Sequence, residues 1–195
     1  QRAKGRARHR AGGGSAKTAR KIKKFIAHFP KIGCNLKFMK DRLFHALHSG
    51  PKVVERLMRA FPTDRLDDRI EKDRFTAREV IGHVADWEMI FLDRIRIANL
   101  RPGSQVEGYD PCDRAKEHHY SDKDVFHEAE VYESRRMTTI EYLQNLSDAD
   151  WDKTFVAGDN RTFTIREYVM AMICHDMYHV DQLSSYFANE VATIA

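Results

Sequence analysis

Two short segments, Phe75–Glu79 and Phe163–Glu167, constrain the fold of this chain more than any other feature. They read Phe-Thr-Ala-Arg-Glu and Phe-Thr-Ile-Arg-Glu, so in each a threonine precedes a glutamate by three residues. This spacing is a capping box, in which the hydroxyl and the carboxylate satisfy backbone N–H groups at a helix start. The preceding phenylalanine is placed to act as a hydrophobic staple. We therefore expect two helices that begin in the same way.

Apolar residues recur at intervals of three and four over four segments, which is the pattern of amphipathic helices. The sequence predicts helices over about 39–60, 75–99, 121–145 and 163–189. In the first helix, the proline of Gly50-Pro51 is expected to cause a kink or a restart. Gly158–Arg161 is expected to form a tight turn before the last helix, and a small hairpin around this turn is one option. These patterns predict an all-α domain.

A long polar connection, residues 100–120, separates the second and third predicted helices. Connections of this length are unusual between bundle helices. This one is long enough to run the length of a bundle and let the two helices lie parallel. The third helix is expected to start at Ser121, because Asp124 follows three residues later in a capping pattern.

Charge is divided unevenly along the chain. Residues 1–38 hold 12 of the 33 basic residues and no acid, so residues 39–195 hold 21 bases, all 29 acids and a net charge of −8. We expect 1–38 to be a disordered extension, because it has too little apolar surface to offset its ordering entropy, and 39–195 to be the folded domain. The acidic domain is a poor nucleic-acid ligand, since phosphate binding needs clustered Lys and Arg.

The basic extension has three interpretations. It is Arg-rich and acid-free, as transit peptides are. It also has the charge of a non-specific nucleic-acid arm. The third interpretation is that translation begins at Met39, and we favour this one.

Cysteine content and hydropathy indicate the compartment. The three cysteines, Cys34, Cys112 and Cys174, are odd in number and widely spaced, which argues against a disulfide framework and for a reducing compartment. No run of 18 apolar residues occurs, so no transmembrane helix is expected. We therefore expect a cytoplasmic protein. Cys174 is expected to be a buried packing residue of the last helix.

His175 and His179 lie four residues apart in the last predicted helix. Residues at this spacing project from one face, about 6 Å apart along the axis, and two neutral imidazoles there can bind one metal ion. His83 is the candidate third ligand, because it lies among apolar residues of another helix and needs a partner if buried. Chance occurrence of the pair, and a buried neutral His83 bonded to a carbonyl or a carboxylate, are the alternatives.

Three further residues are placed to orient these ligands. Asp86 follows His83 by three residues, and Gln182 follows His179 by three, so each shares its ligand's face. Asp176 is the third candidate. A metal-bound histidine usually donates its second N–H to such an oxygen.

Two segments of the sequence together resemble the DinB/YfiT-like superfamily of metal-binding four-helix bundles. They are 75–88 (Phe-Thr-Ala-Arg-Glu-Val-Ile-Gly-His-Val-Ala-Asp-Trp-Glu) and 175–183 (His-Asp-Met-Tyr-His-Val-Asp-Gln-Leu). The family pattern is a histidine near the start of helix two, followed about ninety residues later by His-x-x-x-His and a glutamine. The resemblance covers roughly residues 39–189. Phe75 departs from it, because many members have a tryptophan there.

The resemblance implies a four-helix bundle with up-down-down-up topology and a long crossover between helices two and three. It also implies that His83, His175 and His179 bind one divalent ion, most often zinc or nickel, and that the protein is a homodimer. Some members use the metal to hold a low-molecular-weight thiol as its thiolate for S-transfer, one is a thiol-dependent isomerase, and hydrolase activity has been proposed.

The leading hypothesis is a metal-dependent enzyme acting on a small-molecule substrate, with a thiol or a water as the nucleophile. No catalytic residue is assigned beyond that metal-bound nucleophile. The alternative is a non-catalytic metal-binding protein of the damage or stress response. An open three-histidine site favours the enzyme, whereas a fourth protein ligand favours the structural role.

Overall fold

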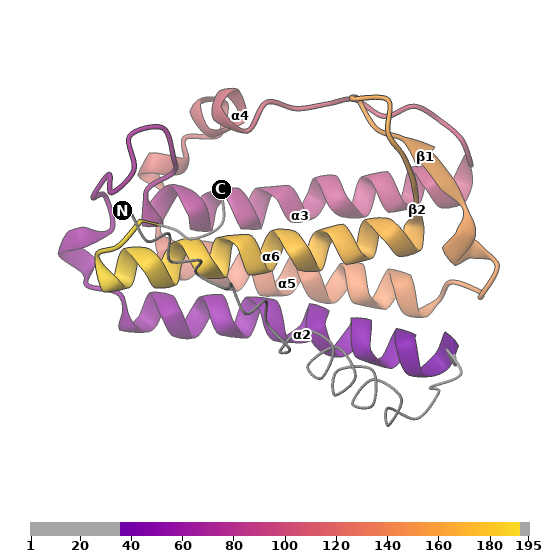
Figure 1. Cartoon of the computed structure of the whole chain (residues 1–195), viewed down its shortest axis with the longest axis horizontal. Coiled ribbons are helices and arrows are strands. Elements are labelled where there is room, and N and C mark those ends of the chain that lie inside the picture. Colours follow the sequence, from indigo (N-terminus) through magenta and orange to yellow (C-terminus); the bar gives the residue numbers. More distant parts are fainter. Residues whose placement is uncertain (1–35, 192–195) are drawn as a thin grey trace, which may run out of the picture. The chain divides into compact units, whose positions relative to one another are not determined.

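The computed structural model describes residues 36–191, and from Lys40 onward these residues belong to one compact unit. Its four long helices are α2 (Leu36–Ala60), α3 (Ala77–Leu100), α5 (Val125–Gln144) and α6 (Ile165–Ala188), labelled as in Figure 1. The predicted all-α class is confirmed. No helix within 36–191 is long and apolar enough to cross a membrane. The predicted disorder of 1–38 stays a prediction for residues 1–35, which lie outside the described part, and it is wrong for residues 36–38, which belong to α2.

The helices follow the predicted up-down-down-up order. Figure 1 shows α3 and α5 running in one direction and α2 and α6 in the other. The crossover between α3 and α5 carries the short helix α4 (Pro111–Glu117) and a 3₁₀ turn, η2 (Tyr120–Asp122). It returns along the bundle, so α5 starts at the end where α3 starts (Figure 1).

Both predicted capping boxes form. The Glu79 carboxylate accepts from the backbone N–H of Thr76 at 2.8 Å, and the Thr76 hydroxyl accepts from the N–H of Glu79. Glu167 and Thr164 make the same reciprocal pair, with the Thr164 N–H at 2.9 Å from the carboxylate. These caps fix where α3 and α6 begin, and with that the turn on which each histidine lies.

The third long helix begins later than predicted. Asp124 is its N-cap, with a side-chain oxygen that accepts from the N–H groups of Phe126 and His127. Ser121 lies in the preceding 3₁₀ turn. The predicted start at Ser121 is wrong, because aspartate is itself among the strongest N-cap residues.

Helix α2 continues through Pro51 without the restart that we considered. A proline at this position removes the N–H that would bond to the carbonyl of Leu47, four residues earlier. The Arg136 side chain of α5 donates to that carbonyl instead, with Nη1 3.2 Å from the oxygen. A tertiary hydrogen bond thus replaces the missing helical one.

The predicted hairpin forms between α5 and α6. Its antiparallel strands are β1 (Thr154–Val156) and β2 (Thr162–Thr164). The start of the crossover pairs with it, since the N–H of Val106 donates to the carbonyl of Val156 at 2.9 Å. Gly108 and Gly158 let the crossover pass the hairpin turn, because a Cβ on Gly158 would lie 2.7 Å from the Gly108 Cα.

Buried apolar side chains form two clusters, separated along the bundle. Residues that are not apolar meet between the two clusters, with at least one from each long helix: Gly50 in α2, Glu88 in α3, Arg136 in α5 and Asp176 in α6. Gly50 is needed there, because a Cβ at this position would lie 2.6 Å from a carboxylate oxygen of Asp176. The middle of the bundle is therefore a polar layer.

Candidate functional site

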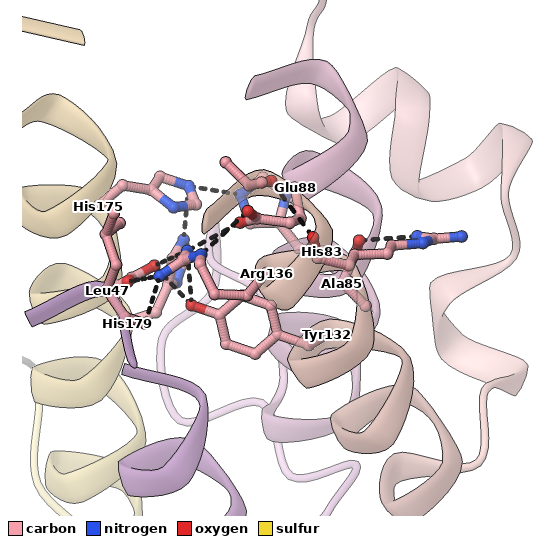
Figure 2. Close-up of polar contacts among 11 residues, drawn as sticks. Leu47, His83, Ala85, Glu88, Tyr132, Arg136, His175 and His179 are labelled. Carbon is pink, nitrogen blue, oxygen red and sulfur yellow. Dashed lines mark hydrogen bonds and ion pairs between the residues drawn. The ribbon is translucent and has the colours of Figure 1, made fainter. Parts of the chain in front are cut away.

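Helices α3 and α6 bring the three predicted histidines together. The Nε2 atom of His175 lies 3.0 Å from Nε2 of His83 and 3.2 Å from Nε2 of His179. One nitrogen from each ring falls within 4.8 Å of the other two. Figure 2 shows the three side chains facing one another across the two helices. We call these residues the histidine cluster.

Gln182 determines which nitrogen of His179 carries the proton. The Gln182 side-chain amide nitrogen donates to the carbonyl of Phe75 at 3.3 Å, and that carbonyl can only accept. The amide oxygen therefore faces Nδ1 of His179, 3.0 Å away, and Nδ1 is the donor. In the neutral ring, Nε2 then presents a lone pair to the other histidines. Gln182 therefore makes the contact expected from the sequence, and its role toward a metal-bound His179 stays a prediction.

Burial keeps the cluster neutral. It lowers the pKa of His175 to about 4, helped by the Arg136 charge, and the pKa of His179 to about 3, helped by His175. The pKa of His83 is also lowered well below its ordinary value, first by burial and then by the two other histidines. At neutral pH the cluster thus offers unprotonated nitrogens.

His83 lacks a polar partner for its second nitrogen. Its Nδ1 is buried and has no hydrogen-bond partner among the described residues. Its ring instead lies between aromatic groups, with centroids 4.7 Å from Trp87 and 5.2 Å from Phe75. The alternative of a neutral His83 held by a carbonyl or a carboxylate finds no support within residues 36–191.

The cluster fits a divalent metal ion. A zinc ion with Zn–N bonds of about 2.0–2.1 Å places neighbouring ligand nitrogens about 3.3 Å apart. The two separations from His175 Nε2, 3.0 and 3.2 Å, are close to this value. A single proton on His175 Nε2 can be donated to only one of its two neighbours. A cation between the rings accepts all three lone pairs, so the donor set suits a metal better than it suits internal hydrogen bonds.

The cluster opens into a pocket of about 300 Å³. Besides the three histidines and Gln182, its walls include Arg74, Phe75, Trp87, Cys112 and Tyr178. No fourth His, Cys, Asp or Glu belongs to the cluster within the described part of the chain. Three nitrogen ligands with space beside them leave room for a further ligand from solution.

Asp86 does not contact His83 as expected. Its carboxylate accepts from Arg114, with Nη2 at 3.1 Å, and from the Tyr120 hydroxyl at 2.6 Å. Burial alone would raise the pKa of Asp86, but the hydrogen bonds from Arg114 and Tyr120 outweigh it and lower that pKa. Both partners lie on the crossover, so Asp86 holds the crossover against α3.

Asp176 does not orient a histidine either. It belongs to a second buried group, which we call the Arg136 cluster: Arg136, Glu88, Asp176 and Tyr132. Arg136 donates to both oxygens of each carboxylate at 2.7–3.0 Å, and the Tyr132 hydroxyl donates to Asp176 at 2.6 Å. The signal for this cluster in the sequence is Arg136, a charged residue within the apolar stripe of a predicted helix, and the predicted site residues include only Asp176 of this group.

The cysteines do not complete the site. Cys174 is exposed, so its predicted burial is wrong: it lies on the solvent face of α6, about 100° around the helix from His175. Cys112 is exposed on α4, at the edge of the pocket. Cys34 lies outside the described residues.

Comparisons with known proteins agree on the family and the fold. A sequence model of the DinB superfamily matches residues 46–183. A relative from Oceanobacillus iheyensis, named as a candidate metal-dependent hydrolase, is 21% identical over 135 residues, which cover 69% of this chain and 78% of the relative. YfiT from Bacillus subtilis, described as a probable metal-dependent hydrolase with an unusual four-helix bundle topology, has a TM-score of 0.74 at 17% identity. That likeness covers 83% of this chain and 93% of YfiT, and it shows the shared fold.

Proposed function

The chain belongs to the DinB superfamily, and on this premise we propose that it is an enzyme with a divalent metal ion bound by His83, His175 and His179. The observation that carries the proposal is the convergence of three neutral imidazoles, two buried and one half-buried, from two helices within 4.8 Å. Imidazole nitrogens suit zinc and nickel, which are the ions we propose. The names of the relatives support metal dependence.

A divalent ion in such a site lowers the pKa of a coordinated water or thiol and so supplies a nucleophile near neutral pH. The residues of this chain provide the conditions for that chemistry. Gln182 holds His179 in the tautomer that exposes Nε2, and Phe75 and Trp87 pack against the His83 ring. Arg74 and Tyr178 bond to each other at the wall of the pocket, which leaves a polar edge beside the histidines.

Hydrolysis of a small-molecule substrate is our first assignment, because both relatives are described as hydrolases. S-transfer with a low-molecular-weight thiol as cosubstrate is the second. The pocket of about 300 Å³ beside the histidines has room for such a cosubstrate. The non-catalytic alternative has less support, because the described residues supply no fourth ligand.

Elemental analysis tests the metal site. We expect about one divalent ion per wild-type chain and at least about a tenfold lower content in His179→Ala. His45→Ala is the matched control, because His45 is exposed on α2 and outside the cluster, and it should keep its metal. If the wild type carries no more metal than His179→Ala, the proposed function is wrong.

Activity assays separate the candidate reactions. Wild type and His45→Ala are compared with His179→Ala on a panel of esters and amides, and in thiol-consumption assays with several electrophiles. Turnover without added thiol that falls by about a hundredfold or more in His179→Ala supports hydrolysis. Turnover only with thiol supports S-transfer. A metal-loaded protein that is inactive in both assays, and that loses thermal stability on chelation, supports the non-catalytic role. Homodimerisation and cytoplasmic location stay predictions.

A further inference from the structure

A second pocket, of about 430 Å³, adjoins the pocket over the histidine cluster. The two pockets share Trp87 and His175 as wall residues. A molecule in the second pocket therefore lies beside one of the three candidate metal ligands. Its volume falls within the range of about 300–1,000 Å³ that is usual for small-molecule sites.

Aromatic rings form much of the wall of this second pocket. They belong to Trp87, Phe91, Tyr109, Phe163 and Tyr168. The Tyr168 ring is fixed in place, with centroids 5.5 Å from Phe91 and 5.7 Å from Phe163. Walls of this kind favour a flat, apolar ligand such as another aromatic ring.

The charged side chains of the pocket leave one positive charge without a counter-charge. Arg161 and Asp159 both line it, and they pair with each other at 2.6 Å. Arg94 also lines the pocket, and it forms no ion pair with any carboxylate of the described residues; it donates only to the Tyr168 hydroxyl and to the Glu107 carbonyl.

Tyr168 adds a second donor beside Arg94. Its oxygen accepts from Arg94 Nη1 at 2.8 Å, and within residues 36–191 its own O–H has no acceptor. Burial raises the pKa of Tyr168, so the hydroxyl stays protonated. A guanidinium and a phenol hydroxyl side by side, both with hydrogens to donate, match the two oxygens of a carboxylate.

We propose that the second pocket binds an aromatic carboxylic acid, with the carboxylate on Arg94 and Tyr168 and the ring against the aromatic wall. This names the substrate class and rests on the proposed function, because the ring is then held next to His175 and the nucleophile. Arg94 and Tyr168 are binding residues in this assignment, and neither takes part in the chemical step.

Binding of benzoate and benzamide tests the assignment without requiring turnover. The two probes have the same ring and differ in charge. Trp87 reports on the pocket by fluorescence, and the only other tryptophan, Trp151, is fully buried in the core and gives a constant background. The full chain is titrated as purified and again after metal chelation. Arg94→Met and Tyr168→Phe are compared with Arg96→Met, which alters an exposed arginine of the same helix that pairs with Asp93.

We expect the wild type and Arg96→Met to bind benzoate about tenfold more tightly than benzamide, with or without metal. The preference should fall to about one in Arg94→Met and to an intermediate value in Tyr168→Phe. Equal binding of the two probes by the wild type, or an unchanged preference in Arg94→Met, would overturn the assignment. Failure of the metal site would appear separately, as equal metal content in wild type and His179→Ala.

Discussion

The histidine cluster and the Arg136 cluster lie in the same bundle, share helices α3 and α6, and differ in how completely their polar atoms are paired (Figure 2). Arg136 donates to two carboxylates and to the Leu47 carbonyl, and a tyrosine hydroxyl completes the group. In the histidine cluster, the Nε2 atoms of three neutral rings face one another, and His83 Nδ1 has no partner among the residues described.

This difference indicates separate roles. Burial alone would lower the pKa of Arg136, but Glu88, Tyr132 and Asp176 raise it well above its ordinary value, so the arginine stays charged. A network paired in this way leaves no charge without a partner to attract a ligand, and its hydrogen bonds hold the helices together. Burial and polarity are common to both clusters. Only the histidine cluster brings three Nε2 atoms face to face with no carboxylate or amide between them, and this marks it as a site for a ligand.

Removal of the arginine is expected to have the largest effect on stability. Arg136→Met leaves two carboxylates buried without their counter-charge and should lower the free energy of unfolding by about 3–5 kcal/mol, measured by urea denaturation. Arg59→Met is the control, because Arg59 forms an exposed pair with Glu55 and should cost at most about 1 kcal/mol. A loss below about 1 kcal/mol in Arg136→Met would show that the cluster does not hold the helices.

The second-largest predicted effect is a loss of stability on acidification, caused by the histidine cluster. The folded-state pKa values of His175 and His179 are about 4 and 3, below their ordinary 6.5, so the unfolded chain takes up protons first as pH falls. The free energy of unfolding of the metal-free protein should therefore decrease from about pH 6.5 toward pH 4, by about 2 kcal/mol or more at pH 5.

The pH effect is measured by urea denaturation at pH 7 and pH 5. His179→Leu should lose less stability between these two values, because one of the depressed groups is gone. Equal losses in the variant and the wild type would place the acid sensitivity elsewhere in the protein.

The smallest predicted effect concerns Gln182. Gln182→Leu removes the acceptor that fixes the His179 tautomer, and it should weaken metal affinity by about tenfold, measured by competition with a chelator. Ser184→Ala, an exposed change on the same helix, should leave the affinity unchanged. Unchanged affinity in Gln182→Leu would mean that His179 needs no support from this side chain.

Local patterns in the sequence anticipated much of the fold and the three histidines. Capping boxes and the four-residue spacing of His175 and His179 act within one or two helical turns, so they can be read from neighbouring residues. The hydrogen-bond partner of Asp86 could not be predicted from neighbouring residues, because Arg114 lies 28 residues later on the crossover. Asp176 is a different case: it follows His175 directly, and adjacent residues on a helix point about 100° apart, so spacing already argued against a shared face.

The sequence by itself determined where α3 and α6 begin, where the hairpin turns and that His175 and His179 share one face of a helix. These properties follow from hydrogen bonds and side-chain spacing within single elements. Only the tertiary structure decided that α2 passes through Pro51, since the guanidinium that bonds to the Leu47 carbonyl comes from α5. It also decided which buried polar groups are paired and which are not, because pairing depends on the distances between helices that are far apart in the chain.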